Sequence, residues 1–457
     1  MPAKSAQKRA RTEKALTPAD LAQRTLQRRA VEAAIWGMPI VSVEAMRRAF
    51  FNAGAKYGDI VYLSKPADWQ FQLTTPNSSS LYSYLNYNLK DGPFVLELPT
   101  AAGAGLFGSI LDAWQVPLAD AGPDGEDQGE GGKYLLLGPD FKGHPPPGYF
   151  AVRSDTRNGY AAFRAIPKTR SDEDTVKALA LIRQIRLYPL TQDANSTATR
   201  YIDVAGKLFD GIVRMDDTFF DSLARMLNEE PTQTRDLAAM GQLRSLGIEK
   251  GSGFKPDSTA RAILKKAAGE AQKVLMDAVT SVIPYWPDSH WGLPGYAITG
   301  AQTAFTYQTA ALLNVDDRGA MFFFACAGPK KLGAATLYLI GSRDASGAML
   351  DGSKHYRLRV PPGVPARQFW AVTVYDLETA AFIRQSPKTE VNSYQGLRKN
   401  DVESVDVFFG PKAPSGNESN WIYTEPARPW LACFRLYGPE KAMHNKSWVL
   451  PDIEKLN

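Results

Sequence analysis

The sequence predicts a mainly β protein with a helical middle segment: two β-sandwich or jelly-roll-like domains joined by an α-helical region. Two observations predict this layout. Short apolar runs separated by Gly- and Pro-containing turns fill residues 57–165 and return after residue 335. Between them, residues 172–283 show apolar positions that recur at helical spacing. The 457 residues are enough for two or three domains, each with its own core.

The N-terminal segment, residues 1–30, carries most of the net positive charge of +5. It holds eight Lys and Arg against two Asp and Glu, whereas the rest of the chain holds 45 against 46. A near-neutral body does not support a nucleic-acid surface, which needs Lys and Arg gathered on one folded face. Within this segment Thr17 is expected to cap a helix that begins at Pro18, and Gly37 followed by Pro39 is expected to end it.

The first β domain is expected over residues 31–168. Its strand-like runs are short and alternate with turn sequences such as KPAD and KDGP, which favours an antiparallel sandwich or barrel. The runs are DIVYL, WQFQL, LYSYLNYNL, FVLEL, LFGSILDAW, KYLLLG and YFAVR.

The helical connecting region is expected over residues 169–334. The segments DEDTVKALALIRQIRLYPL and GKLFDGIVRMDDTFFDSLARMLNEE are interpreted as helices, Gly247 is expected to end a further helix, and Asp257 to cap the next. The C-terminal jelly-roll-like domain then covers residues 335–457. Its strand-like runs are ATLYLIGS, HYRLRV, QFWAVTVYD, SVDVFFG, NWIYTE and WLACFRLYG.

Common cofactor and metal motifs do not account for this chain. Gly103, Gly105 and Gly108 fit the spacing of a dinucleotide-binding turn, but Pro117 breaks the segment that should open a helix, and no βαβ unit surrounds it. The four histidines are scattered, with no pair at metal-ligand spacing. We therefore predict no organic cofactor and no metal site. Cys326 and Cys433 lie in apolar surroundings and are expected to be buried free thiols.

Several segments resemble a bacterial two-domain family. WGMPI, TPNSSSLYS, GPFVLELP, LDAW and KYLLLGPDFKGHPP are similar to its N-terminal domain, domain of unknown function 1254. LDGSKHYRLRV, PARQFWAVTVYD, NSYQG, NWIYTEP and FRLYGPEKAMHNKSWVLP are similar to its C-terminal companion, domain of unknown function 1214. The resemblance implies two β-sandwich-like domains, the second a jelly-roll variant, with a helical region between them. It implies no established reaction.

One motif departs from the family pattern. The first domain usually carries T-P-N-N-D-T, whereas Asn77 is followed here by Ser78, Ser79 and Ser80. If the missing Asp acts as an acid, base or ligand, this chain lacks that function. If the motif only shapes a turn, serines replace it, because their hydroxyls also bond to nearby backbone.

The first functional hypothesis is a cofactor-independent enzyme, or enzyme-like binder, of an uncharged or weakly polar small molecule in a cleft between the β domains. Asp112 is the general acid or base candidate, since a carboxyl beside Trp114 can be desolvated and its pKa raised. The alternative for Asp112 is a buried residue that organises the first domain. The predicted catalytic residues are Asp112, Asp376 and Arg435, and the predicted substrate-binding residues are Asn77, Tyr82, Trp114, Trp370 and Tyr375.

Trp370 and Tyr375 differ by an odd number of positions, so on one strand they should point to opposite faces. Only one of them is then expected to face a site.

Two other classes of function remain open. Trp421, Tyr423, Trp430, Phe434, Tyr437 and Trp448 lie close together in the sequence, so they could form a non-catalytic sugar-binding surface or the core of the sandwich. The third hypothesis is a structural, homo-oligomer-forming protein. The chain lacks an apolar segment that could cross a membrane or act as a signal peptide, so we expect a cytoplasmic protein, or a periplasmic or secreted one if a leader is missing from the sequence.

Overall fold

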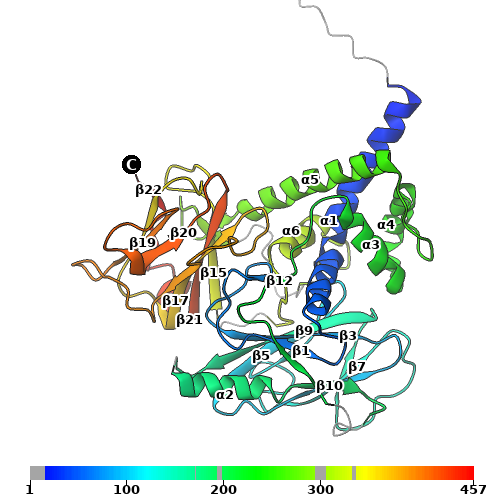
Figure 1. The fold of residues 1–457 in the computed structure, drawn as a ribbon, viewed down its shortest axis with the longest axis horizontal. Helices are drawn as coiled ribbons and strands as arrows, with labels where there is room; N and C mark the ends of the chain where they lie inside the picture. Colours follow the sequence, from blue (N-terminus) through cyan, green and yellow to red (C-terminus); the bar gives the residue numbers. More distant parts are fainter. Residues whose placement is uncertain (1–15, 170, 193–197, 294–304, 332–335, 457) are drawn as a thin grey trace, which may run out of the picture.

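The computed structural model describes residues 16–169, 171–192, 198–293, 305–331 and 336–456. Most of the basic N-terminal segment, residues 1–15, lies outside these ranges. Strands make up 29% and helices 26% of the chain, so the fold is mixed α/β and not mainly β. Figure 1 shows the N-terminal sheets at the bottom, the C-terminal sheets at the left and the long helices at the upper right.

Two sheets form the N-terminal β domain, and their inner faces enclose one core cluster. The first sheet has the order β11-β1-β3-β9-β5-β6, with bounds Tyr201–Asp203, Ile60–Tyr62, Leu81–Asn88, Asn158–Pro167, Ala104–Asp112 and Pro117–Ala121. The second has the order β10-β4-β7-β8, with bounds Arg186–Pro189, Phe94–Leu98, Gly132–Leu137 and Phe150–Arg153. A separate two-stranded sheet pairs β12 (Phe209–Asp210) with β2 (Phe71–Gln72).

The C-terminal half also contains two sheets around a core of its own. The first has the order β13-β14-β15-β21-β17-β18, with bounds Ile283–Pro284, Trp291–Leu293, Thr336–Gly341, Trp430–Pro439, Ala366–Asp376 and Glu390–Asn392. The second has the order β20-β19-β16-β22, with bounds Trp421–Tyr423, Val405–Gly410, Tyr356–Val360 and Glu454–Lys455.

The helices lie mainly between and beside the two β domains (Figure 1). They are α1 (Pro18–Asn52), α2 (Asp172–Ile182), α3 (Thr218–Glu229), α4 (Leu237–Leu243), α5 (Ser258–Thr280), α6 (Val315–Phe324) and α7 (Lys441–His444). Short 3-10 turns cover Thr234–Asp236, Arg244–Leu246 and Glu418–Asn420. Among the residues described, no helix is both long and apolar enough to span a membrane.

The prediction that the first helix ends at Gly37 is wrong. Thr17 caps α1 as expected, but the helix runs on through Gly37 and Pro39 to Asn52. From Ala30 onward nearly every side chain of α1 is buried, so packing outweighs the local cost of Gly and Pro in a helix interior. Helix α3 lies so close to Gly37 that a Cβ at this position would stand 2.8 Å from Leu223 Cδ1. Glycine has no Cβ and therefore allows this close contact.

The middle segment also differs in part from the prediction. The segment that ends in RLYPL forms α2 only as far as Ile182, and its end becomes β10, which pairs with β4. The segment that begins with GKLFD forms β12 before α3 starts at Thr218. A short apolar run is compatible with a helix or with a strand. In these two segments, pairing with β4 and with β2 favours the strand. Gly247 ends a 3-10 turn at φ 80°, and Asp257 caps α5, as expected.

One hydrophobic cluster joins the two halves of the molecule. It contains most of buried α1, the face of the N-terminal sheet that carries Tyr84 and Tyr160, and residues of the C-terminal β17 and β21 such as Tyr375 and Leu431. The polar groups at the edge of this shared cluster form the candidate site.

Candidate functional site

The strands β17 and β21 of the C-terminal domain have one apolar face and one polar face. Trp370 and Phe434 lie in the sandwich core, with their rings stacked at 5.8 Å between centroids. Tyr375 lies instead in the cluster shared with α1, which confirms that it and Trp370 point to opposite faces. On this second face Arg435 Nη1 donates to Thr373 Oγ1 at 2.7 Å, and Arg435 Nη2 donates to the Tyr375 hydroxyl at 2.6 Å.

The N-terminal sheet contributes a matching pair of side chains. Tyr82 on β3 stands directly opposite Arg164 on β9 in the antiparallel register, so both side chains lie on one face. In the C-terminal sheet Tyr338 on β15 stands opposite Arg435 on β21 in the same way. Arg164 interacts with the Tyr338 hydroxyl, which brings the two pairs together across the domain boundary.

The loop that carries the TPNSSS motif docks onto this polar face. The Tyr375 hydroxyl donates to the Pro76 carbonyl at 2.5 Å, and Asn77 Nδ2 donates to the Tyr437 hydroxyl at 2.5 Å. Thr75 adopts φ 40°, a conformation that is unfavourable for a β-branched residue, and its carbonyl accepts from Arg435 Nη2 at 3.4 Å. The motif therefore does more than turn the chain: it joins the two domains.

We call the side chains that meet here the Arg–Tyr cluster, and its core is held by stacking on guanidinium groups. Arg435 lies over the ring of Tyr338 at 5.0 Å and over that of Tyr375 at 5.4 Å. Cys326 lies beside the cluster, where burial raises the pKa of its thiol to about 11 and keeps it protonated. The Arg–Tyr cluster consists of Tyr82, Arg164, Tyr338, Tyr375, Arg435 and Tyr437.

The charges around the Arg–Tyr cluster do not balance. Its neighbouring carboxylate, Glu390, accepts from Ser79 Oγ at 2.7 Å and from Thr373 Oγ1 at 2.8 Å. Thr373 therefore bridges Glu390 to the buried Arg435, and that carboxylate offsets one guanidinium charge. Arg164 forms no salt bridge with any carboxylate in the described ranges. The cluster as a whole keeps one unbalanced positive charge.

Three phenols of the Arg–Tyr cluster, those of Tyr82, Tyr375 and Tyr437, remain neutral at physiological pH and can donate hydrogen bonds. Burial raises the pKa of Tyr82 to about 12, although the charges of Arg164 and Arg435 oppose that rise. Burial also raises the pKa values of Tyr375 and Tyr437 above the ordinary value for tyrosine. Tyr82, Arg164 and Tyr338 are only half-buried, so part of each side chain is open to solvent.

Asp112 and Trp114 lie away from the Arg–Tyr cluster. Asp112 pairs with Gly159 on β9, five positions along that strand from Arg164, a separation of about 17 Å at the usual strand rise. One Asp112 carboxyl oxygen accepts from the Trp114 and Val116 backbone amides, both at 2.8 Å. These contacts organise the turn after β5. They agree with the alternative in which Asp112 is a buried residue that organises the first domain.

The environment of Asp112 nevertheless raises the pKa of its carboxyl group, as expected. Burial raises the pKa of Asp112 to about 7, while its backbone hydrogen bonds and the charge of Arg235 oppose that rise. Trp114 packs against Trp36 with 4.8 Å between ring centroids, and the Arg318 guanidinium lies over its ring at 5.1 Å. Trp114 therefore packs against α1, in the same extended hydrophobic cluster as Tyr375.

Asp376 also lies apart from the Arg–Tyr cluster. Its carboxylate pairs with Arg428 at 2.5 Å and accepts from the Thr379 amide at 3.1 Å. Of the eight predicted site residues, Asn77, Tyr82, Tyr375 and Arg435 therefore gather at the domain boundary. Asp112, Trp114, Trp370 and Asp376 occupy other environments.

The aromatic cluster near the C-terminus belongs mainly to the sandwich. Trp430 is 1% exposed, and Trp448, which is half-buried, stacks on Phe434 at 6.1 Å. Trp421 donates its indole N–H to the Gly410 carbonyl at 2.9 Å. These contacts favour the core interpretation over an open platform for sugars.

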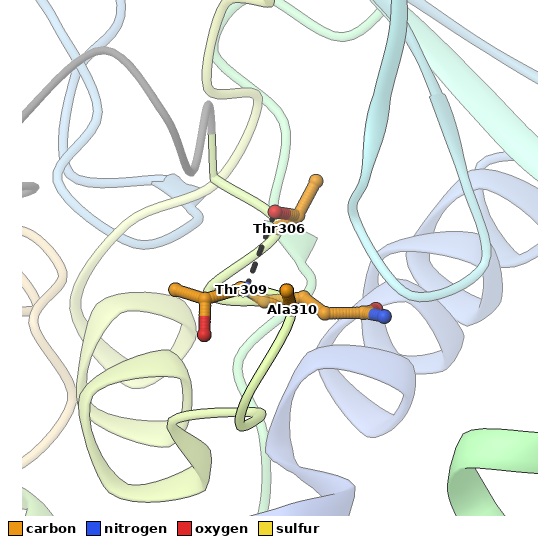
Figure 2. Close-up of a pocket in the computed structure, with 4 residues that line it drawn as sticks. Thr306, Thr309 and Ala310 are labelled. Carbon is orange, nitrogen blue, oxygen red and sulfur yellow. Dashed lines mark hydrogen bonds between the residues drawn. The ribbon is translucent and has the colours of Figure 1, made fainter.

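A separate cavity of about 440 Å³ lies at the loop before α6 (Figure 2). Its described lining, Thr306, Gln308, Thr309 and Ala310, is small and carries no charge. Gln308 accepts from Arg235 at 3.0 Å. In the described part of the chain, no group of three or more His, Cys, Asp and Glu side chains could hold a metal ion.

Arg164 and Tyr338 are not among the site residues predicted from the sequence, although the sequence contains a signal for Arg164. Arg164 interrupts the otherwise small and apolar run YAAFRAIP, and Arg435 interrupts WLACFRLYG in the same way. A charged residue inside a strand that is buried on both faces needs partners, so such positions indicate a polar site. Both cysteines are free, as expected, and Cys433 is buried whereas Cys326 is only half-buried.

Comparisons with known proteins agree with this architecture. DUF1254, described as a protein of unknown function, matches residues 58–189, and DUF1214, with the same description, matches residues 335–441. None of the curated proteins compared with the chain matches it.

Two solved structures resemble the whole chain. The VPA0106 protein from Vibrio parahaemolyticus has a TM-score of 0.54 at 16% identity, over 94% of this chain and all of that one. An uncharacterized protein from Burkholderia cenocepacia has a TM-score of 0.41 at 14% identity, over 95% of this chain and 94% of that one. The first likeness concerns the fold alone. The two domain matches, in this order along the chain, show that the protein belongs to the two-domain family that joins DUF1254 to DUF1214.

Proposed function

We propose that the protein binds a small molecule at the Arg–Tyr cluster and holds it by a carboxylate or another oxyanion. One observation carries this proposal: Arg164 is a half-buried guanidinium without a carboxylate partner among the described residues, and the phenols of Tyr82 and Tyr338 flank it. Guanidinium and phenol groups only donate hydrogen bonds to an anion, and a partly desolvated setting strengthens such bonds.

The imbalance of charge changes the expected ligand. The sequence favoured an uncharged or weakly polar molecule, whereas an unpaired guanidinium favours a molecule with one negative charge. The aromatic rings around Arg164 and Arg435 would contact the apolar part of such a ligand.

Binding is better supported than acid–base catalysis. The carboxylate beside the Arg–Tyr cluster, Glu390, already accepts hydrogen bonds from Ser79, Thr373 and Asn392. Asp112 could act as a base only at a distance, since it lies near the opposite end of β9. An enzyme reaction at this site would therefore depend on stabilising an oxyanion, as the phenol and guanidinium donors are arranged to do.

The test compares benzoate with benzamide, which has the same ring and no charge, by isothermal titration calorimetry. We expect benzoate to bind more tightly, and Arg164→Gln to weaken benzoate binding by about tenfold or more because a charge-assisted hydrogen bond is lost. Tyr82→Phe should weaken it by less, because the flanking ring remains. Arg153→Gln, which removes an exposed arginine from β8, is the matched control. Equal binding of benzoate and benzamide, or unchanged affinity in Arg164→Gln, would contradict the proposal.

A further inference from the structure

A second cavity, of about 510 Å³, lies where the N-terminal sheet meets the helical region. The end of α1, the turns after β3 and before β9, and the end of α3 all contribute to it. We call it the Phe51 pocket. Its lining residues are Arg47, Phe51, Tyr57, Asn88, Lys90, Arg157, Asn228 and Glu229.

The floor of the Phe51 pocket is held together by ion pairs and hydrogen bonds. Arg47 is 6% exposed and pairs with both Glu44 and Glu229, each at 2.6 Å. Arg47 also donates to Asn158 Oδ1 at 2.9 Å, and Asn158 Nδ2 donates to Glu229 at 2.9 Å. These contacts preorganise the floor, and the Glu229 side chain, which is 35% exposed, still offers carboxylate lone pairs to a ligand.

One wall of the pocket is aromatic and open. Phe51 is 39% exposed, whereas its neighbour Phe50 is fully buried. The Phe51 ring meets the Tyr57 ring edge-on at 5.3 Å between centroids, and this contact holds it against the pocket. A fixed ring with an exposed face suits the apolar C–H face of a sugar ring, and it adds little conformational entropy cost on binding.

The rest of the lining is polar and includes one cation, Lys90, that has no ion pair among the described residues. The Lys90 ammonium group has no hydrogen bond or ion pair among the described residues, and its side chain is exposed. Arg157 uses Nε for Asp140 at 2.8 Å and Nη1 for the Glu229 carbonyl at 3.1 Å, which leaves Nη2 available. The Asn88 and Asn228 amides each use one N–H and one oxygen lone pair inside the protein. The second N–H and the second lone pair of each amide remain for hydroxyl groups, which need both donors and acceptors.

We infer that the Phe51 pocket binds an acidic sugar, that is, a six-membered sugar ring with one carboxylate. The ring face lies on Phe51, the hydroxyl groups bond to the amides and to Glu229, and the carboxylate pairs with Lys90 and Arg157. A simple anion would make no contact with the Phe51 ring, and a neutral sugar would form no ion pair with Lys90. None of the residues that line the Phe51 pocket belongs to the Arg–Tyr cluster.

The experiment compares glucuronate, glucose and acetate, which separate the ring from the charge. Measured by ligand-observed NMR titration, glucuronate should bind most tightly, glucose about fivefold more weakly, and acetate most weakly. Lys90→Met keeps the aliphatic stem and should reduce glucuronate affinity to that for glucose. Phe51→Ala should weaken both sugars by about tenfold, and Val274→Ala, at an exposed apolar position on α5, is the matched control.

Three outcomes would overturn the inference. The first is no binding of either sugar, and the second is acetate binding as tightly as glucuronate. The third is glucuronate binding that survives Phe51→Ala and is lost in Arg164→Gln, because it would assign the sugar to the Arg–Tyr cluster. Both Phe51 and Lys90 are exposed, so their variants should fold, and matching thermal melts of the variants would establish this.

Discussion

At the scale of single residues, Asp112 couples burial to pH. Its carboxyl is 3% exposed, and burial raises its pKa from 3.8 to about 7. Between these two values the folded protein holds a proton that the unfolded chain has lost. Its contribution to stability is therefore present below pH 4 and is lost as the pH rises to 7.

Asp112→Asn should remove this loss, because an amide does not titrate and its oxygen can still accept from the Trp114 and Val116 amides. The free energy of unfolding of the variant, relative to the wild type, should improve by about 2 to 3 kcal/mol between pH 5 and pH 8. Urea denaturation at pH 5 and at pH 8 measures this difference in the free energy of unfolding. Asp401→Asn, at an exposed position, is the control. A difference that does not change with pH would show that Asp112 is ionised throughout.

Arg164 shows what could be recognised at this scale and what could not. Its position inside an apolar strand is visible in the sequence and indicates a partner. Which partner it meets depends on Tyr338, which is more than 170 positions away along the chain, so no local pattern could identify it.

At the scale of elements, the strands were the more predictable part. Alternation and turn residues located the runs that become β1, β3, β4, β5, β15, β17 and β21. Helix ends were less predictable, because α1 crosses Gly37 and Pro39 where local propensity favours a stop. Packing against α3, α5 and α6 supplies the compensation, and that information is not local.

Two helical glycines provide a test of this explanation. Gly269 in α5 has open space where a Cβ would stand, so Gly269→Ala should raise the free energy of unfolding by about 1 kcal/mol through helix propensity. Gly37→Ala should give no such gain, because its Cβ would stand 2.8 Å from the buried Leu223 side chain. Guanidinium denaturation of both variants measures the difference, and an equal gain at both sites would refute the packing explanation.

At the scale of the whole molecule, the two β domains are joined by polar contacts and by one apolar cluster. The TPNSSS loop bonds to the polar face of the C-terminal sheet, and one apolar cluster extends from α1 to Tyr375 and Leu431. Removal of the N-terminal half would expose this cluster to solvent. It would also remove part of the structure that buries Arg435, including the Thr75 carbonyl.

A fragment of residues 281–456, which keeps every strand of both C-terminal sheets, should therefore be much less stable than the same residues in the full chain. We expect it to unfold at a lower temperature and to bind a hydrophobic dye, whereas the full chain should unfold in one transition. Thermal melts followed by circular dichroism check both expectations. A fragment that melts at the temperature of the full chain would show that the domains are energetically independent.

The sequence by itself determined the order of β, helical and β segments, the neutral body behind a basic N-terminal segment, and the family. These properties follow from composition, local periodicity and short motifs, all of which act over a few residues. The tertiary structure decided that Asn77, Tyr82, Tyr375 and Arg435 meet, and that Asp112, Trp114, Trp370 and Asp376 lie elsewhere. Their grouping depends on strand register and domain docking between positions hundreds of residues apart, and local patterns carry no record of such contacts.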